Sequence, residues 1–188
     1  MYHDRADGRL MAGWQQGDAA AFGALVRRWQ GPIARFLARL LGPAAALDDL
    51  CQEVFIRVCE ASTRYRETGA FSTWLYRIAL NVARDAGRKR RRTLLPLEDE
   101  AMPVAPSCPV TDCARRETTE LVADAVAELP EPLRLVLVLH HYEELNFEQI
   151  ACLTKTPAST LKSRFAVALA RLRTRLQQLG YDLKESIR

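Results

Sequence analysis

A group of hydroxyl-bearing and basic side chains, suited to hydrogen bonding with an anionic partner, stands at the start of an expected helix. These residues are Ser159, Thr160, Lys162 and Arg164. A short helix around 148–153 precedes them and a break at 154–157 separates the two, which is a helix-turn-helix layout. Such a helix can present hydroxyls, cations and free backbone N–H groups to the major groove of DNA. Two helices packed in an ordinary bundle would give the same pattern, so the motif alone leaves both interpretations open.

A second group consists of the cations that end an earlier helix. Six basic residues lie between Arg84 and Arg92, and Asp85 is the one acid among them. Contact with several phosphates would give strong, salt-sensitive binding to nucleic acid. The charge alone is also compatible with a solvated helix end or a disordered arm.

Aromatic residues near this helix could stack on unpaired bases. Trp74 shares its apolar helical stripe with Ile78, which favours packing in the core over stacking on a base. Tyr65 lies in an expected loop between Arg64 and Arg66. We therefore expect Tyr65 to be the more exposed aromatic of this region.

Metal binding and catalysis find little support in the sequence. Cys108 and Cys113 have four residues between them, and His140 and His141 are adjacent, but neither pair has a second ligand pair at zinc-site spacing. The sequence has no glycine-rich phosphate loop, no G-x-S-x-G and no H-E-x-x-H. We expect no metal, no cofactor and no catalytic residue, hence no enzyme; a redox or metal response of Cys108 and Cys113 stays an open hypothesis.

The elements that position these groups are all expected to be helices. Apolar residues recur at the three-to-four spacing of a buried helix face from Phe22 to Leu40 and, after shorter patterns, from Trp74 to Val82. Asp18 can cap the first of these helices and Gly42 ends it, while Ser72 can cap the later one. No segment alternates as a strand does, so the expected fold class is all-α.

Composition divides the 188 residues into three parts. Residues 1–95 carry a net charge of +7, residues 96–115 carry −3 with four prolines, and residues 116–188 are neutral. We expect two small helical domains joined by a flexible linker at 96–115, the first domain facing a polyanion such as nucleic acid. The sequence has no apolar run long enough to cross a bilayer and no secretory signal at its start, so we expect a cytoplasmic protein with reduced cysteines.

Five motifs follow one another along nearly the whole chain. They are Asp48–Val58, Phe71–Asp85, Leu129–Glu131, Phe147–Ala151 and Ser159–Arg164. Together they closely resemble bacterial sigma factors of the sigma-70 family, extracytoplasmic-function (ECF) group. The resemblance implies a non-enzymatic initiation factor, with sigma region 2 in 1–95, sigma region 4 in 116–188 and a linker that threads RNA polymerase.

The resemblance also implies roles for individual residues. The helix that carries Asp49, Gln52, Glu53 and Phe55 would bind the clamp helices of the largest subunit of core RNA polymerase. Exposed acids and amides would set orientation and association rate there, and apolar contacts would supply most of the affinity.

Two further sets of residues would bind promoter DNA by the same resemblance. The minus-10 set, which would capture an extruded base and hold the opened strand, is Arg64, Tyr65, Arg66, Asn81, Arg84 and Arg88. The minus-35 set, which would read duplex DNA, is Ser159, Thr160, Lys162, Ser163 and Arg164. Extraction of a base costs a few kcal/mol, and the basic helix end would help to offset that cost.

Two departures from the family pattern concern the second domain. Lys155 stands in the turn where the family usually has glycine, and a left-handed residue other than glycine carries a steric cost. Ala166 and Val167 stand where the family often has an aromatic or basic pair. We therefore expect less major-groove contact beyond Arg164.

Two interpretations of function stay open on the sequence. The first is a sigma factor, a class commonly held inactive by an anti-sigma factor that is often membrane-anchored. The alternative is a stand-alone helix-turn-helix transcriptional regulator, which would usually bind a palindrome as a dimer. The acidic linker and the lack of an evident dimerisation helix favour the sigma factor.

Overall fold

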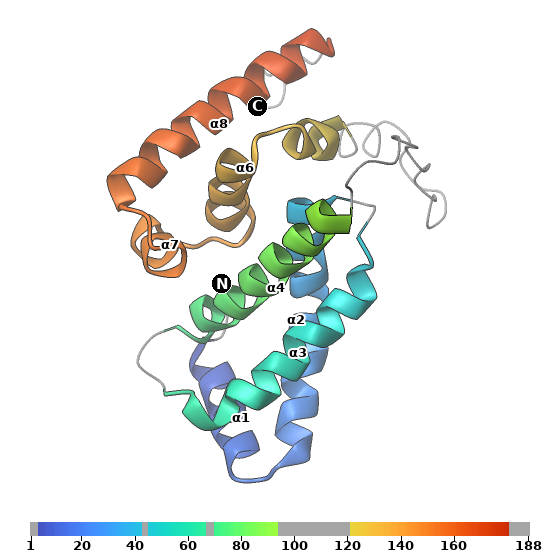
Figure 1. Cartoon of the computed structure of the whole chain (residues 1–188). Helices are drawn as coiled ribbons and strands as arrows, with labels where there is room; N and C mark the ends of the chain where they lie inside the picture. The colour runs from blue at the N-terminus through green and yellow to red at the C-terminus, as the bar shows by residue number, and fades with distance from the viewer. Residues whose placement is uncertain (1–3, 43–44, 67–69, 94–120, 181–188) are drawn as a thin grey trace. The chain divides into compact units, whose positions relative to one another are not determined.

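The computed structural model describes residues 4–42, 45–66, 70–93 and 121–180. Every regular element in these ranges is a helix, and no strand occurs within them (Figure 1), which confirms the expected all-α class. The chain divides into two compact units, with the division between Ala101 and Met102. The predicted linker at 96–115, including Cys108 and Cys113, lies outside the described residues, so its bounds stay a prediction.

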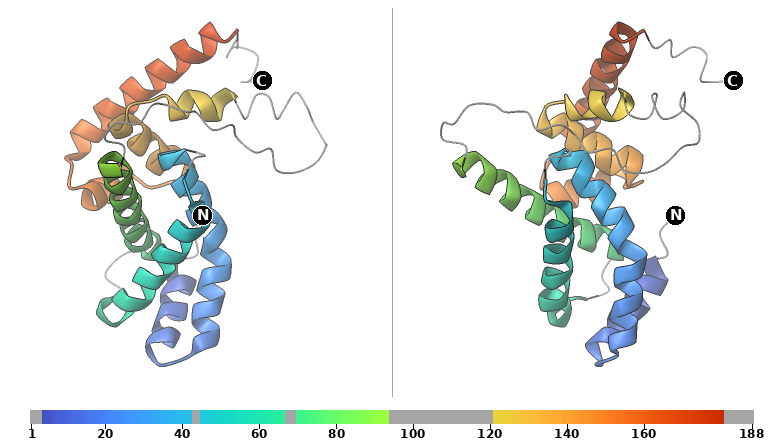
Figure 2. Two further views of the ribbon diagram at one scale, coloured as in Figure 1. Left: turned by 45° about the vertical axis from the view of Figure 1, so that its right-hand side comes forward. Right: turned by 90° about the vertical axis from the view of Figure 1, so that its right-hand side faces the viewer.

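The first unit is a small helical bundle. Its elements are α1 (Asp4–Gln15), α2 (Ala19–Leu41), α3 (Leu47–Ala61), the short 3-10 turn η1 (Ser62–Arg64) and α4 (Phe71–Thr93). Helices α1, α3 and α4 all pack against α2, and α3 also packs against α4; Figure 2 shows the group from two further sides. Its core is formed by large apolar side chains, among them Leu25, Trp29, Ile33, Phe36, Leu37, Val54, Val58, Leu75 and Tyr76.

Local signals in the sequence fix the ends of α2. The Asp18 carboxylate accepts hydrogen bonds from the backbone N–H groups of Ala20 and Ala21 at 2.9 and 3.2 Å, so it satisfies donors that a helix start leaves free. Gly42 ends the helix with φ of 78°, a left-handed conformation that glycine adopts without strain. Both predictions are confirmed. The prediction for Ser72 is wrong, because α4 already begins at Phe71 and Ser72 is buried in its first turn.

Tyr65 belongs to the core of this unit, and the prediction that it is exposed is wrong. Its ring lies 4.8 Å from that of Trp74 and 5.9 Å from that of Phe71, centroid to centroid, and the residue is only 6% exposed. Gln15 of α1 donates hydrogen bonds from Nε2 to the carbonyl oxygens of Ser62 and Tyr65 at 2.6 and 3.2 Å. The N-terminal helix therefore holds the loop that carries Tyr65 against the bundle.

The second unit has a shorter helix order. Residues 121–127 are helical, α6 (Glu131–Leu137) continues into the π-helical turn η2 (Val138–Tyr142), and α7 (Phe147–Thr154) precedes the long α8 (Ala158–Gln178). Helices α6 and α7 both pack against α8. The core of the unit is formed by apolar side chains from all of these helices, among them Val126, Leu129, Val136, Leu137, Leu139, Ile150, Leu161, Ala168 and Leu176.

Candidate nucleic-acid and protein interfaces

The outer side of α3 carries the four residues expected to bind a protein partner. Asp49 and Gln52 are exposed, and Glu53 and Phe55 are partly exposed. All four lie on α3, which has Asp48 and Asp49 in its first turn. Carboxylates at this end stabilise the helix because they interact favourably with the helix dipole. The structure thus places all four where a partner can reach at least part of each side chain.

One apolar residue of this helix was missed by the sequence reasoning. Val54 and Val58 point into the core and are fully buried, whereas Ile56 is 53% exposed. Ile56 follows Gln52 and Glu53 by four and three residues, so the three lie on neighbouring positions of one helix face. This spacing could have shown from the sequence that Ile56 is exposed, because a residue on the face opposite the buried valines has to point outwards.

An ion-pair network joins α3 to α4. The Arg57 Nε lies 2.8 Å from Glu53 Oε1, and the Arg57 Nη1 lies 2.8 Å from Asp85 Oδ2. Asp85 also accepts a hydrogen bond from Arg88 Nη2. The hydrogen bond from Arg57, assisted by that from Arg88, holds the pKa of the Asp85 carboxyl below its ordinary value. The Asp85 carboxylate raises the pKa of Arg57 in turn, so the Arg57–Asp85 pair stays charged at neutral pH.

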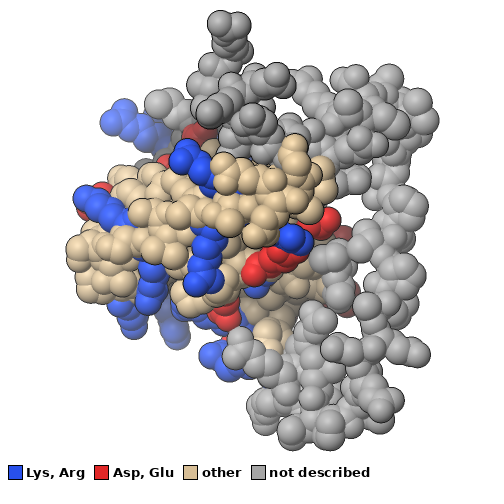
Figure 3. All heavy atoms as spheres, turned by 90° about the horizontal axis from the view of Figure 1, so that it is seen from above, with Lys and Arg blue, Asp and Glu red and all other residues tan. Residues whose placement is uncertain are grey.

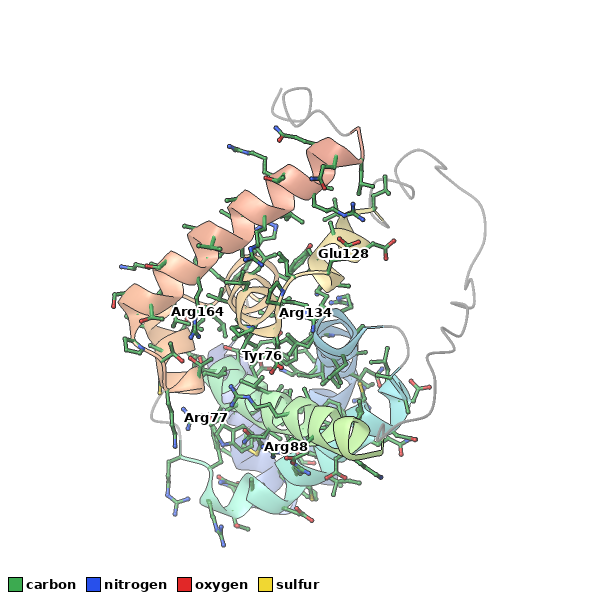
Figure 4. All side chains as sticks on the ribbon, turned by 45° about the horizontal axis from the view of Figure 1, so that its top comes forward. Tyr76, Arg77, Arg88, Glu128, Arg134 and Arg164 are labelled. Carbon is green, nitrogen blue, oxygen red and sulfur yellow. The ribbon has the colours of Figure 1, made fainter. Side chains whose placement is uncertain are left out.

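Three arginines and an asparagine of α4 form a stripe along one side of the helix, called here the basic stripe. Asn81 and Arg88 are exposed and Arg84 is partly exposed, at the three-to-four spacing of one face. Arg77, four residues before Asn81, extends this stripe and is also exposed; Figure 4 shows Arg77 and Arg88 on α4. The sequence reasoning missed Arg77 because it searched for a dense basic run rather than for the helical period.

The length of this stripe matches an extended ligand. Arg77 and Arg88 are eleven residues apart, or roughly 16 Å along an α-helix. One strand of B-DNA carries one phosphate per about 3.4 Å of helix axis, so a stripe of this length spans several phosphates. The arrangement therefore suits a nucleic-acid strand better than a single anion.

The loop before α4 contributes two of its three predicted residues to the surface. Arg64 and Arg66 are exposed, and Arg66 Nη1 donates to the carbonyl oxygens of Thr63 and Tyr65 at 3.1 and 3.0 Å. Tyr65, as described above, is turned inwards. Residues 67–69 of this loop lie outside the described part of the chain.

In the second unit, a tight turn sets α7 against α8. Asn146 accepts a hydrogen bond from the Gln149 backbone N–H at 2.8 Å, and the Gln149 side chain accepts one from the Asn146 N–H at 2.9 Å, which is a capping box at the start of α7. Lys155 ends α7 in the left-handed conformation, with φ 55° and ψ 36°. The left-handed turn anticipated at this position is confirmed, and it leads through Pro157 into α8.

The start of α8 presents the predicted polar residues together. Ser159, Lys162 and Ser163 are exposed, and Thr160 and Arg164 are partly exposed. Figure 4 shows Arg164 on this helix, and Figure 3 shows, in a view from above, Lys and Arg side chains that reach the surface. The group is therefore available to a partner as a surface.

Two contacts restrict what these side chains can do. The Ser163 hydroxyl donates to the Ser159 carbonyl oxygen at 3.1 Å, so its lone pairs stay available to accept a hydrogen bond. The Lys162 ammonium lies 5.9 Å from the centre of the Phe147 ring, within the range of a cation–π contact. Lys162 is thereby oriented by α7 while its charge still faces solvent.

The two histidines are not arranged as metal ligands. The His140 ring stacks on Phe147 at 4.3 Å and meets Phe165 edge-on at 4.7 Å, and its Nδ1 lies 2.8 Å from the Leu145 carbonyl oxygen. His140 thus packs the helix-turn-helix together. Among the residues that the structure describes, no group of three His, Cys, Asp or Glu side chains could hold a metal ion.

Comparison with known proteins gives a consistent assignment. Sigma-70 region 2 matches residues 25–93 and sigma-70 region 4 matches residues 119–172. The RNA polymerase sigma-H factor of Pseudomonas aeruginosa is 33% identical over 95% of this chain and 98% of its own length. The ECF RNA polymerase sigma-E factor of Escherichia coli K12 is 30% identical over 88% of this chain and 91% of its own length.

Solved structures show the same fold. CnrH in complex with the cytosolic domain of CnrY is 25% identical, with a TM-score of 0.69 over 92% of this chain and 98% of that one. The sigma factor RpoE of Bartonella quintana, in complex with the anti-sigma factor NepR, is 19% identical, with a TM-score of 0.70 over 83% and 96%. None of the helices in the described ranges is long and apolar enough to span a membrane.

The matches to both sigma-70 regions and the similarity to the curated relatives show that the chain belongs to the extracytoplasmic-function group of the sigma-70 family, whose members are non-enzymatic transcription initiation factors.

Proposed function

We propose that this chain binds core RNA polymerase through the outer face of α3 and directs it to promoters with minus-10 and minus-35 elements. The observation that carries the proposal is that two surfaces of different character lie on adjacent packed helices. Asp49, Gln52 and Glu53 make a polar, acidic face on α3, and the basic stripe runs along α4. An acidic face attracts a basic protein surface, and Phe55 and Ile56 add apolar area to it.

The α4 stripe would hold the opened DNA strand at the minus-10 element. Asn81 can hydrogen-bond to a base, and Arg84 and Arg88 can bind phosphates. Arg64 and Arg66 would contact the strand beside the extruded base. Because Tyr65 is buried, we propose that it supports this loop from within the core instead of contacting a base.

The start of α8 would read the minus-35 element as duplex DNA. Lys162 and Arg164 can bind phosphate or guanine edges, Ser159 and Thr160 can donate or accept, and Ser163 is an acceptor. These are few contacts, so region 4 alone would bind weakly. Simultaneous binding of both elements through one polymerase supplies the missing affinity.

An anti-sigma factor would regulate the chain. The CnrH structure, which shares this fold, contains the cytosolic domain of a second protein, CnrY. A partner of that kind could cover the exposed face of α3 and so compete with polymerase. We propose that the chain acts in the cytoplasm, where core polymerase transcribes. A pull-down from the native host would identify the regulator.

Run-off transcription with core polymerase on genomic fragments tests the proposal. The wild-type chain is expected to direct specific initiation. The Asp49→Ala/Gln52→Ala variant, which changes the α3 face, is expected to lose affinity for core polymerase. The Arg84→Ala variant, which changes the α4 stripe, is expected to lower the salt dependence of open-complex formation. Gln30→Ala, which changes an exposed residue of α2 instead of α3, is the control. Tight binding of the isolated chain to a palindrome, with no specific transcript, would favour the stand-alone regulator instead.

A further inference from the structure

The ion-pair network between α3 and α4 connects the two proposed binding faces of region 2. It consists of Glu53, Arg57, Asp85 and Arg88, in which negative and positive charges alternate. Glu53 at one end belongs to the proposed polymerase face, and Arg88 at the other end belongs to the proposed DNA stripe. Each inner residue therefore has two partners, one on the side of each face.

The inner pair is partly shielded from water. The side chains of Arg57 and Asp85 are 34% and 42% exposed, whereas that of Arg88 is 71% exposed. Interactions between partly buried charges are screened less than those between exposed ones. A change at one end can therefore reach the other through Arg57 and Asp85.

We infer that this network makes polymerase binding and DNA binding by region 2 mutually favourable. When a cationic group of the polymerase pairs with Glu53, Arg57 loses that partner and pairs with Asp85 only. Arg57 then neutralises Asp85 without the help of Arg88, so Arg88 is released and can bind a DNA phosphate. Arg57 and Asp85 act here as positioning residues, and the inference rests on the proposed function of both faces.

The coupling also works in the opposite direction. When a DNA phosphate binds Arg88, Asp85 keeps Arg57 as its one partner in the network and holds it more firmly. Arg57 then binds Glu53 more weakly, so the Glu53 carboxylate is available to the polymerase. Coupling between two sites is reciprocal by necessity. Each ion pair that is exchanged contributes about as much free energy as a partly exposed salt bridge. The expected coupling is therefore about two- to fivefold in affinity.

The test uses the full-length chain and a labelled 20-nucleotide oligothymidylate at low ionic strength. Glu53→Gln mimics occupation of Glu53 and is expected to tighten oligonucleotide binding about twofold. Glu60→Gln makes the same charge change on the same helix, and Glu60 makes no ion pair with any residue that the structure describes. If the two variants bind the oligonucleotide equally, the inference is overturned.

Epistasis separates the network from a structural effect. In an Arg57→Gln or an Arg88→Gln background, Glu53→Gln is expected to have no more effect than Glu60→Gln, because the connection is cut. An undiminished effect in either background would refute transmission through these residues. Thermal melting of each variant checks folding. If Arg57→Gln unfolds the bundle, the comparison of Glu53→Gln with Glu60→Gln and the Arg88→Gln background still test the inference.

The same variants distinguish this inference from the proposed function. Failure of the proposed function means that the wild-type chain directs no specific transcript with core polymerase. Failure of the coupling alone means that the wild-type chain transcribes normally while Glu53→Gln and Glu60→Gln bind the oligonucleotide alike.

Discussion

The turn between α7 and α8 contains a residue whose replacement should stabilise region 4. Lys155 is exposed and holds φ at 55° and ψ at 36°, where the β-carbon crowds the backbone at a cost of about 1–2 kcal/mol. Lys155→Gly removes that cost but adds about 0.4–1 kcal/mol of conformational entropy to the unfolded chain. The expected net gain is about 0.5–1 kcal/mol, or about 2–8 °C in the melting temperature of a unit of this size.

The assay can isolate region 4 because the tryptophans report on region 2 alone. All three tryptophans, Trp14, Trp29 and Trp74, lie in the first unit, so their fluorescence follows its unfolding, whereas far-ultraviolet circular dichroism follows both units. Lys155→Gly should raise the melting temperature of a dichroism component that fluorescence does not show. Lys155→Ala, which keeps the β-carbon, is the control; an equal rise in this variant, or no rise with glycine, would refute the explanation by backbone strain.

Three further predictions concern region 2. Arg28→Gln leaves the fully buried Asp7 without its ion-pair partner, and since Arg28 is itself 41% exposed the expected loss is about 1–3 kcal/mol in urea unfolding; an unchanged midpoint would contradict it. Tyr65→Ala should cost about 3–5 kcal/mol and Tyr65→Phe much less, because the ring contacts remain; a fully stable alanine variant that loses DNA binding would instead indicate a base contact. Arg57→Gln should raise the pKa of Asp85, measured by carboxyl titration in NMR spectra. Because the folded pKa of Asp85 lies below 3.8, its stabilisation is present above that pH and is lost as the pH falls through the folded value; an unshifted titration would exclude Arg57 as the cause.

The sequence predicts the elements of this fold wherever the signals are local. The ends of α2 follow from the hydrogen bonds of Asp18 and the left-handed Gly42, and neither depends on distant residues. The position of α8 follows in the same way from the break at 154–157 and the buried Leu161. The polar residues of the helix-turn-helix could thus be placed on one helix before any tertiary contact was known.

The features that the sequence did not predict depend on tertiary contacts. Helix α1 buries Asp7 among its apolar positions, and that interrupts the pattern by which amphipathic helices are found. Tyr65 follows a polar turn and is flanked by arginines, yet Trp74 and Phe71 supply an aromatic surface for its ring. The π-helical turn at 138–142 likewise places His140 between two phenylalanine rings, a packing that no local pattern encodes.

The distribution of charge supports the proposal that the two domains act through a common partner. Residues 1–95 carry a net charge of +7, whereas residues 116–188 are neutral, so non-specific attraction to DNA belongs mainly to region 2. Region 4 adds no net positive charge, so in the proposed function it would contribute base contacts more than electrostatic affinity. In the free chain part of the region 2 charge is held by its own acids, since Asp85 pairs with both Arg57 and Arg88. In the proposed function, a polymerase that binds the acids of α3 would therefore increase the positive charge available to DNA. The same polymerase would bring the neutral region 4 within reach of the same duplex.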